Sequence, residues 1–327
     1  MEGTKLVKDT SLVEINSLDV RIEGVRRVVH PLQSVSFAIG NGARTGLVGE
    51  SGSGKSMTAL AMLRILPAYG RITNGSILFD GQDLVTLSNE QMRKVRGRRI
   101  GLILQNARAA LNPVFSVGQQ IVDLCQYHEG SNSRDGWKKA VEMLEDMGIP
   151  RAAEKARQYP HQYSGGMAQR AMIAMALVCS PDLLIADEPT TGLDVTIEEQ
   201  VLDLIVDVVQ TSQASLLLIS HDIGVIRQVC TDVVVMYAGK IMETGPQERV
   251  LSSPSHPYTQ ALMNCFETYS DPKRQMEFIR GRVPDLADSH AGCAFADRCP
   301  HVERQCREES PVPVQTENGR WVACHFV

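Results

Sequence analysis

A glycine-rich segment that begins at residue 49 has the residue types and the spacing to hold phosphate groups. It fits the pattern G-x-x-x-x-G-K-[ST], follows an apolar run and precedes a helix-prone segment, which is the context that this pattern requires. Glycines let backbone N–H groups turn toward phosphate oxygens, and the N-terminus of the following helix adds positive potential. Lys55 can neutralise charge on the β- and γ-phosphates, and Ser56 can bind Mg²⁺. A flexible turn is the alternative, but the context favours a nucleotide-binding loop made of Gly49, Glu50, Ser51, Gly52, Ser53, Gly54, Lys55 and Ser56.

Two adjacent acids follow the apolar run Leu183–Ala186 and could assist hydrolysis of a bound nucleotide. Asp187 can bind Mg²⁺, directly or through water, and Glu188 can act as a general base on the attacking water. Such a pair is often only a helix cap, so its interpretation depends on the phosphate loop. His221 could contact the γ-phosphate and position the water, and Gln105 could reach Mg²⁺ or water.

These polar residues each follow one of four short apolar runs. The runs are continuous rather than alternating, which is typical of strands covered by helices on both faces of a mainly parallel sheet. Ligands of open α/β sheets bind beyond the carboxyl ends of the strands, so we expect the polar residues to gather at one edge. A buried helix segment is the alternative for any single run. The predicted strands are Thr45–Val48, Ile100–Leu104, Leu183–Ala186 and Leu216–Ile219.

Helices and a change in composition divide the chain into parts. The sequence predicts helices at Lys55–Leu66, which ends before a proline, and at Met167–Cys179. The polar, helix-prone stretch Asn106–Tyr163 lies between two predicted strands, and it indicates an inserted helical subdomain at about residues 106–166. After Gly245, repeated prolines indicate a loop-rich tail.

The composition is that of an ordinary globular protein with no bias toward nucleic acid. Of the 327 residues, 43% are hydrophobic and 22% are charged, which suffices for a buried core. The net charge of −5 gives no general reason to expect nucleic-acid binding. No apolar run approaches the length of about 18 residues that spans a bilayer, and the N-terminus lacks the apolar stretch of a signal peptide. We therefore expect a cytosolic protein, or one held at a membrane through partners.

The segment Ser164–Arg170, with the sequence Ser-Gly-Gly-Met-Ala-Gln-Arg, resembles the signature sequence of ABC ATPases. The motifs follow the order of that family: the phosphate loop, Gln105, the signature, the two acids, Thr190–Asp194 and His221. Ser-Gly-Gly alone could be a loop or a helix cap, but the complete ordered set is specific. The resemblance covers residues 11–257 and implies a P-loop NTPase fold of the ABC type, with a mainly parallel α/β sheet and an inserted helical subdomain.

The resemblance also implies how two subunits cooperate in ATP hydrolysis. In the family, two ATP-binding subunits pack head to tail, and the signature of one closes over the ATP that the other holds. Transition-state charge is then stabilised only when the dimer is closed. The sequence departs from the family at Val20–Gly24, which lacks the aromatic residue that usually stacks on adenine. The residues implied to contact the partner's ATP are Ser164, Gly165, Gly166 and Gln169, and Asp194 would lie at the dimer seam.

Other segments resemble the oligopeptide/dipeptide/nickel importer branch of the family: Leu66–Gly75, Leu111–Pro113, Met172–Leu177 and Ser255–Tyr258. This resemblance implies a peripheral motor subunit at the cytoplasmic face of the bacterial inner membrane. Its partners would be a second, non-identical ATP-binding subunit, two membrane-spanning permease subunits and an extracytoplasmic substrate-binding protein, with no nucleic acid. Peptides are the favoured cargo, and nickel or a metal chelate is the alternative.

Four cysteines lie in the proline-rich segment at residues 258–327: Cys293, Cys299, Cys306 and Cys324. In an intracellular chain, such a quartet indicates a metal site that stabilises a small fold. The segment resembles the C-terminal extension of peptide-importer ATPases, in which four cysteines hold a [4Fe–4S] cluster. Zn²⁺ is the alternative metal, and unliganded thiols are the third interpretation. We expect the other four in the core: Cys125, Cys179, Cys230 and Cys265.

Two functions from other classes stay open on the sequence alone. One is a soluble ABC-class ATPase that acts on nucleic acid, which the cysteine cluster would allow but the acidic balance and the lack of coiled-coil heptads disfavour. The other is a nucleotide-binding regulator without turnover, which the presence of both Glu188 and His221 disfavours.

Overall fold

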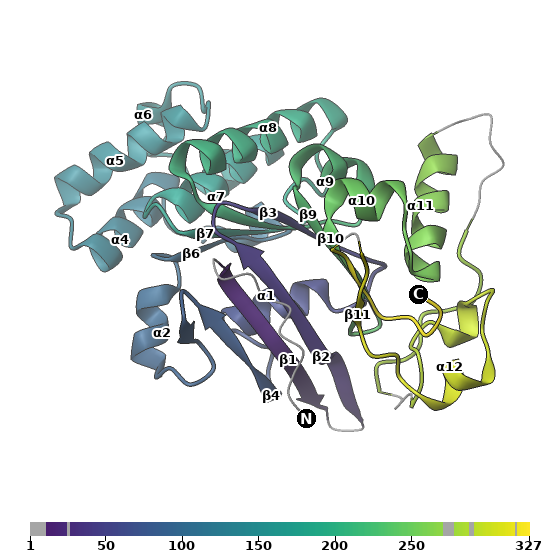
Figure 1. Cartoon of the computed structure of the whole chain (residues 1–327). Helices are drawn as coiled ribbons and strands as arrows, with labels where there is room; N and C mark the ends of the chain where they lie inside the picture. The colour runs from purple at the N-terminus through teal and green to yellow at the C-terminus, as the bar shows by residue number, and fades with distance from the viewer. Residues whose placement is uncertain (1–10, 25–26, 271–277, 288–290, 318) are drawn as a thin grey trace. The chain divides into compact units, whose positions relative to one another are not determined.

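The computed structural model describes residues 11–24, 27–270, 278–287, 291–317 and 319–327. Residues 1–10, where we expect no signal peptide, lie outside the described residues. The chain divides into two compact units: the first combines residues 1–86 with residues 219–327, and the second comprises residues 87–218 (Figure 1). Within the described ranges, no helix is long and apolar enough to cross a membrane.

The first unit begins with a four-stranded antiparallel sheet that the sequence did not lead us to expect. Its strands are β1 (Ser11–Glu23), β2 (Val28–Gly40), β4 (Gly70–Phe79) and β5 (Gln82–Asp83), in the order β2-β1-β4-β5. The pairing of β1 with β2 shifts in register between Ile15 and Leu18, as at a β-bulge. One face of β1 packs in the core because its apolar residues alternate with more exposed ones on either side of this shift; the buried residues include Val13, Ile15, Leu18 and Val20.

A second sheet of the first unit carries the phosphate loop, with strands in the order β11-β12-β10-β9-β3. β3 (Arg44–Val48) pairs in parallel with β9 (Asp232–Tyr237). β10 (Lys240–Pro246) pairs antiparallel with β9 and with β12 (Trp321–Val322), and β12 pairs antiparallel with β11 (Val314–Gln315). The expectation of a mainly parallel sheet was wrong for this unit, because a tight turn at Ala238 and Gly239 joins β9 directly to β10 and reverses the chain.

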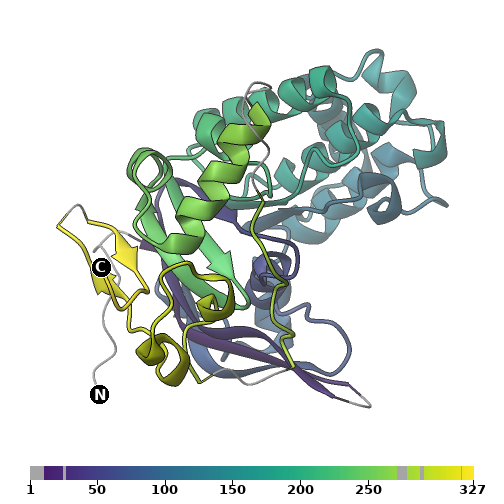
Figure 2. The ribbon, with the colours of Figure 1, turned by 90° about the vertical axis from the view of Figure 1, so that its right-hand side faces the viewer.

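The C-terminal extension is attached to both sheets of the first unit. Backbone N of His30 in β2 donates to O of Leu286 at 2.8 Å, and β12 of the extension pairs with β10 (Figure 2). The helices of this unit are α1 (Lys55–Met62), α9 (Ile223–Val229), α10 (Gln247–Ser252), α11 (Pro257–Ser270) and α12 (Arg304–Glu308). The extension is mostly loop, as the prolines predicted, although it also contains most of α11, the short 3₁₀ helix η2 (Ala296–Arg298) and α12.

The second unit combines a short sheet with a group of helices (Figure 1). β6 (Ile100–Ile103) pairs in parallel with β7 (Leu183–Asp187), and β8 (Ser215–Ile219) follows β7 in the strand order, its last residue belonging to the first unit. Strands therefore occur at all four apolar runs that predicted them. The helices are α2 (Asn89–Val95), α3 (Ala107–Ala110), α4 (Val117–Glu129), α5 (Ser133–Asp146), α6 (Ala152–Lys155), η1 (Pro160–Gln162), α7 (Gly165–Leu177) and α8 (Val195–Ser212).

Capping residues set the ends of the helices between β6 and β7. The side chain of Ser116 caps α4, which ends at Gly130 in the left-handed conformation with φ of 69°. Asn132, two residues later, caps α5.

The helix predicted from Lys55 ends at Met62, four residues early, and is followed by Arg64 with φ of 51°. Of the cysteines expected in the core, Cys125 and Cys230 are buried, whereas Cys179 and Cys265 are half-buried.

Candidate functional site

The phosphate loop joins β3 to α1 in the first unit and depends on glycine at two positions. Gly49 has φ of 150° and Gly54 has φ of 108°, values that residues with a side chain rarely adopt. A Cβ atom on Gly49 would lie 2.1 Å from O of Met236, and one on Gly54 would lie 2.7 Å from O of Pro31. The loop can therefore follow this path against its neighbours only with glycine at both positions.

Lys55 is directed back toward the loop that precedes it. Its Nζ donates to O of Gly49 at 2.7 Å and to O of Glu50 at 3.1 Å, and the residue is buried. An anionic phosphate oxygen is a stronger acceptor for an ammonium group than a neutral carbonyl oxygen. Ser56, the next residue, is exposed. His221, which follows the end of β8 and belongs to the first unit like Ser56, is also exposed. The first unit thus presents a glycine-rich loop with a lysine and a hydroxyl group at the start of α1, and phosphate binding by this loop stays a prediction.

Gln105 and Glu188 lie together in the second unit. Nε2 of Gln105 donates to Oε2 of Glu188 at 2.7 Å, and Oγ1 of Thr191 donates to the same oxygen at 3.1 Å. Glu188 has φ of 47°, a left-handed conformation that costs energy and often marks functional positions. Asp187, the last residue of β7, is half-buried. The parallel pairing of β6 and β7 therefore brings these polar residues to one edge, as the apolar runs predicted.

The signature residues form the N-terminus of α7. Oγ of Ser164 accepts a hydrogen bond from N of Met167 at 3.2 Å, so Ser164 is the N-cap. A Cβ atom on Gly166 would lie 3.0 Å from Cγ2 of Ile197, a contact that favours glycine. Backbone N–H groups at such a helix end can receive an anion. Gln169 is different: it is 4% exposed, and its Nε2 makes no hydrogen bond among the residues that the structure describes. Its contact with the ATP of a partner stays a prediction.

Asp194 caps α8. Its Oδ1 accepts a hydrogen bond from N of Ile197 at 3.0 Å, and the residue is exposed. This local role accounts for an aspartate at the position, so its place at a dimer seam stays a prediction.

The four cysteines of the extension lie near one another in the first unit. Backbone N of Cys293 donates to O of Cys306 at 2.8 Å. Burial raises the pKa of the Cys293 thiol, and the neighbouring thiols of Cys306, Cys299 and Cys324 raise it further. In the part of the chain that the structure describes, however, no group of three or more His, Cys, Asp or Glu side chains is arranged to hold a metal ion. The [4Fe–4S] cluster and Zn²⁺ therefore stay predictions from the sequence.

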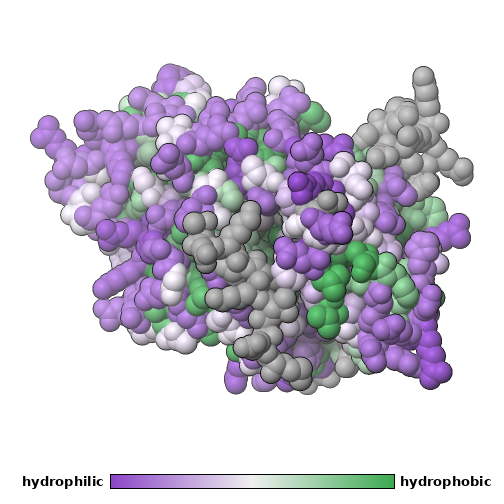
Figure 3. All heavy atoms as spheres, in the orientation of Figure 1, coloured by the Kyte–Doolittle hydropathy of each residue, from purple (hydrophilic) through white to green (hydrophobic). Residues whose placement is uncertain are grey.

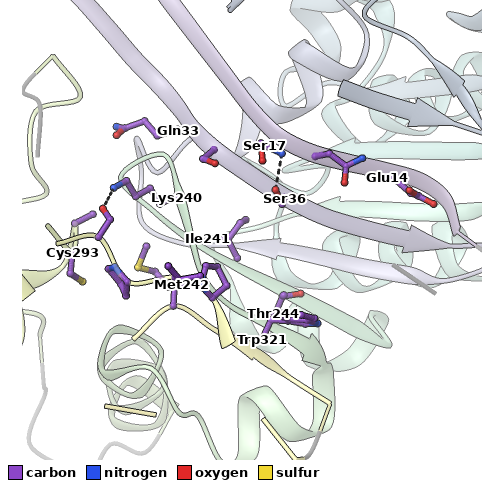
Figure 4. Close-up of a pocket in the computed structure, with 18 of the residues that line it drawn as sticks. Glu14, Ser17, Gln33, Ser36, Lys240, Ile241, Met242, Thr244, Cys293 and Trp321 are labelled. Atoms are coloured by element: carbon purple, nitrogen blue, oxygen red, sulfur yellow. Dashed lines mark hydrogen bonds between the residues drawn. The ribbon is translucent and has the colours of Figure 1, made fainter. Parts of the chain in front are cut away.

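A pocket of about 620 Å³ in the first unit lies apart from the phosphate loop, none of whose residues lines it (Figure 4). Lys240 lies at one end, where its Nζ donates to Oγ of Ser310 at 2.8 Å, and Glu14 lies at the other. Figure 3 shows a hydrophobic patch near β11. Val314, the first residue of β11, is 40% exposed, and Val312, two residues before it, is 70% exposed. The lining of this pocket comes from β1, β2, β4, β10 and the extension, and it includes no residue of the nucleotide motifs.

Comparison with known proteins assigns the family. An ABC transporter model matches residues 32–191, and a model of the oligopeptide/dipeptide transporter C-terminal region matches residues 242–306. The chain is 44% identical over 315 residues to a probable peptide ABC transporter ATP-binding protein of Sinorhizobium fredii, covering 96% of this chain and 94% of that protein. It is 37% identical over 316 residues to the dipeptide transport ATP-binding protein DppD of Escherichia coli, covering 97% of each chain. The chain belongs to the ATP-binding subunits of ABC transporters, in the oligopeptide/dipeptide branch.

Solved structures of ABC ATPases share the fold of this ABC subunit. One is a dimeric ATP-binding cassette in a post-hydrolysis state, bound to ADP and phosphate, with a TM-score of 0.65, 23% identity, and coverage of 72% of this chain and 98% of that chain. Another, from an ABC transporter complex of Clostridium perfringens, has a TM-score of 0.63, 25% identity, and coverage of 75% and 92%. The expected ABC ATPase fold is thereby confirmed. Membership of this family makes ATP hydrolysis the activity of the chain.

Two residues that hold the phosphate loop of this ABC subunit could not be predicted from the sequence. Oη of Tyr258 accepts a hydrogen bond from N of Glu50 at 3.0 Å, and Arg298 forms an ion pair with the Glu50 carboxylate. They lie 208 and 248 residues from Glu50 along the chain. Because spacing motifs report only local order, no motif could have connected these residues to the loop.

Proposed function

We propose that this chain is the ATP-hydrolysing motor subunit of a bacterial ABC importer that takes up dipeptides or oligopeptides. One observation carries the proposal: the chain combines an ABC transporter region with the C-terminal region of oligopeptide/dipeptide transporters. Relatives that align along 96% and 97% of the chain are named as peptide and dipeptide transport ATP-binding proteins. Nickel or a metal chelate is the alternative cargo for the same motor, and the peptide transporter match at residues 242–306 favours peptides.

The phosphate loop and its neighbours have the chemistry to bind ATP with Mg²⁺. Backbone N–H groups of the loop and the ammonium of Lys55 would bind the phosphates. Ser56, Gln105 and Asp187 offer the oxygen ligands that Mg²⁺ prefers, so their donor chemistry fits this ion. When bound, Mg²⁺ neutralises charge on the β- and γ-phosphates.

Glu188 is the residue that we assign to the attacking water. Its carboxylate accepts hydrogen bonds from Gln105 and Thr191, which orient it, and it would act as the general base. His221 would contact the γ-phosphate and help to position the same water. Both assignments rest on residue type and on the motif order of the family.

Hydrolysis is proposed to require a dimer. The anion site at the N-terminus of α7, formed by Ser164–Gly166 with Gln169, would contact ATP held by a second and non-identical ATP-binding subunit. Asp194 would contact the partner at the dimer seam. The solved post-hydrolysis cassette of the same fold is dimeric, which supports this arrangement.

Membrane partners would couple hydrolysis to uptake. We propose two membrane-spanning permease subunits and an extracytoplasmic substrate-binding protein, with this chain as a peripheral subunit at the cytoplasmic face of the inner membrane. The support is that relatives aligned along nearly the whole chain are named as transport ATP-binding proteins.

The experiment that tests this function is reconstitution of the complex that copurifies with this chain from membranes. The complex is placed in vesicles with ATP on the cytoplasmic side, and uptake of a labelled dipeptide is measured with and without a nickel chelate as competitor. We expect ATP-dependent uptake of the dipeptide that the chelate does not inhibit. Dipeptide uptake that the chelate inhibits would favour the alternative cargo.

A nucleic-acid-handling ATPase is the competitor from another class. Its binding to nucleic acid should weaken steeply as salt is raised, because each phosphate contact releases counterions. We expect no salt-dependent binding of DNA or RNA and no stimulation of ATPase by either. The net charge of −5 supports this expectation.

For the extension, we propose that its four cysteines, at positions 293, 299, 306 and 324, hold a [4Fe–4S] cluster, with Zn²⁺ as the alternative. Four neighbouring thiols are chemically suitable ligands for either metal. In the part of the chain that the structure describes, however, the cysteine side chains are not arranged to hold a metal ion. Iron, sulfide and zinc contents of the anaerobically purified chain, with its visible absorption spectrum, would distinguish the two. Absence of all three would leave ordinary thiols.

A further inference from the structure

The C-terminal extension contacts the phosphate loop through an ion pair between Arg298 and Glu50. Arg298 is the last residue of η2, and Glu50 is the second residue of the loop. Nη1 of Arg298 lies 2.5 Å from Oε2 of Glu50, and Nη2 lies 3.0 Å from Oε1. The guanidinium and the carboxylate therefore meet by two hydrogen bonds, the strongest geometry for this pair. Only 5% of the Arg298 side chain is exposed.

The surroundings of Arg298 hold it in one orientation. Besides the two bonds to Glu50, Nη1 donates to Oη of Tyr237 at 3.1 Å, Nη2 donates to O of Ile279 at 3.0 Å, and Nε donates to O of Arg280 at 2.9 Å. An arginine has five N–H groups to donate, so all of them have an acceptor. The hydrogen bonds to Glu50 are also the main reason why the pKa of Arg298 is raised.

Three buried aromatic residues connect this ion pair to the backbone of the loop. The ring centres of Tyr237 and Tyr258 are 4.6 Å apart, and that of Phe295 lies 5.3 Å from each. Tyr258 in turn accepts the hydrogen bond from the backbone N of Glu50. Glu50 is therefore held by its backbone and by its side chain, and both contacts come from the C-terminal part of the chain.

The charge of Glu50 gives this contact a consequence for nucleotide binding. A carboxylate within a loop that binds phosphates repels them unless a cation balances its charge. We infer that Arg298 is a positioning residue for ATP, which neutralises Glu50 and fixes the start of the phosphate loop, so that the C-terminal extension sets the affinity of the loop for nucleotide. This inference rests on the proposed role of the loop in binding ATP.

The geometry requires an arginine. A lysine at position 298 would keep the positive charge, but it could not form the paired hydrogen bonds to Glu50 together with those to the two backbone carbonyls. Arg298→Lys therefore separates the effect of charge from the effect of shape. Arg298→Ala combined with Glu50→Gln removes both charges at once and tests neutralisation directly.

The test measures binding of a non-hydrolysable ATP analogue with Mg²⁺ to the full-length chain by calorimetry at low temperature. Arg307→Ala is the matched control, because Arg307 also lies in the extension but its ion pair with Asp297 is exposed on both sides. We expect Arg298→Ala to raise the Kd by at least about tenfold, as for loss of a charged hydrogen-bonded partner. Arg298→Lys should give an intermediate value, the double variant should recover most of the affinity, and Arg307→Ala should match the wild type.

Unfolding temperatures of the same variants without nucleotide separate affinity from stability. If Arg298→Ala lowered the unfolding temperature but left the Kd unchanged in the folded chain, Arg298 would only attach the extension, and the inference would be wrong. An equal loss of affinity in the single and double variants would also overturn it, because neutralisation of Glu50 would then play no part. A wild-type chain that failed to bind the analogue would overturn the proposed function as well.

Discussion

Gln105 donates a hydrogen bond from Nε2 to Oε2 of Glu188 at 2.7 Å, and so connects the residues that follow two neighbouring parallel strands. Thr191 is a second donor to the same oxygen, so this oxygen of the Glu188 carboxylate is held from two sides. Gln105 also begins the segment that leads into α3 and α4. A displacement of that segment would change the orientation of Glu188 through this bond, which makes Gln105 suited to report the state of the helical part to the proposed catalytic carboxylate.

Replacement of Glu188 by glutamine should abolish hydrolysis and preserve nucleotide binding. An amide cannot accept the proton of the attacking water, and loss of a general base slows a reaction by roughly 10²- to 10⁴-fold. We expect a loss of ATPase activity in this range for the complex with its partner subunits, with retained binding of ATP. Glu199→Gln, an exposed residue of α8, is the control and should keep full activity. Normal turnover by Glu188→Gln would remove Glu188 from the mechanism.

Replacement of Ser164 by alanine should affect hydrolysis more than a cap substitution elsewhere. Ser164 and Ser116 are both N-caps whose hydroxyls accept from the backbone three residues on, at 3.2 and 3.3 Å. Each alanine variant should therefore lose about 1 kcal/mol of unfolding free energy. Only Ser164→Ala should also slow the ATPase of the assembled complex, by at least about tenfold, if its helix end contacts the partner's ATP. Equal activity of the two variants would assign Ser164 to capping alone.

Local sequence predicted some elements of this fold and not others for identifiable reasons. β3, β6, β7 and β8 are continuous apolar runs that need no knowledge of their neighbours. In β1 the alternation of apolar and polar residues breaks at Ser17, which has φ of 46°. The pairing with β2 shifts in register there, so the buried apolar residues change from odd to even positions along the chain. Pro31 argues against a strand, yet β2 tolerates it because β2 lies at the edge of its sheet.

The same division holds for the candidate site. Glycine spacing and the residues after the apolar runs predicted the phosphate loop and Glu188, because each depends on a few adjacent residues. The contacts of Arg298 and Tyr258 with Glu50 depend on how the C-terminal part of the chain returns to the sheet that carries the phosphate loop. Tyr258 and Arg298 lie 208 and 248 residues from Glu50 along the chain. Their contacts with Glu50 result from tertiary packing, so only the structure shows them.

Stability should fall at acidic pH because of His256. This histidine is 1% exposed, and burial lowers its pKa from 6.5 to about 4. Between these values the unfolded chain binds a proton that the folded chain does not, so stability is lost as the pH falls from about 6.5 to about 4, by up to about 3 kcal/mol. Burial also raises the pKa of Glu243, which acts in the opposite direction.

The contribution of His256 is therefore read from the difference between the wild type and His256→Asn. Asparagine can still accept the hydrogen bond that Nδ1 takes from N of Tyr258 at 3.0 Å, but it does not titrate. Urea unfolding across this pH range should show a smaller loss of stability in the variant. Identical pH dependence of the two proteins would exclude His256 as the cause.

Loss of Arg320 should destabilise the attachment of the extension to β10. Nη1 of Arg320 lies 3.4 Å from Oε1 of Glu243, whose side chain is completely buried, and it also donates to O of Ser253. Removing one partner of a buried ion pair leaves an uncompensated charge and costs about 3 kcal/mol. Arg320→Ala should therefore lower the unfolding free energy by about this amount, measured by urea titration at neutral pH.

The double variant Arg320→Ala with Glu243→Gln separates the charge from the packing. A neutral amide can remain buried, and its carbonyl oxygen, in the place of Oε2, can still accept hydrogen bonds from N of Ser255 and N of His256, which lie 3.1 and 2.9 Å from Oε2 of Glu243. If the destabilisation comes from the unpaired carboxylate, the double variant should be more stable than Arg320→Ala. If the two variants are equally unstable, the loss comes from the apolar contacts of the arginine stem, and the ion pair contributes little to holding the extension in place.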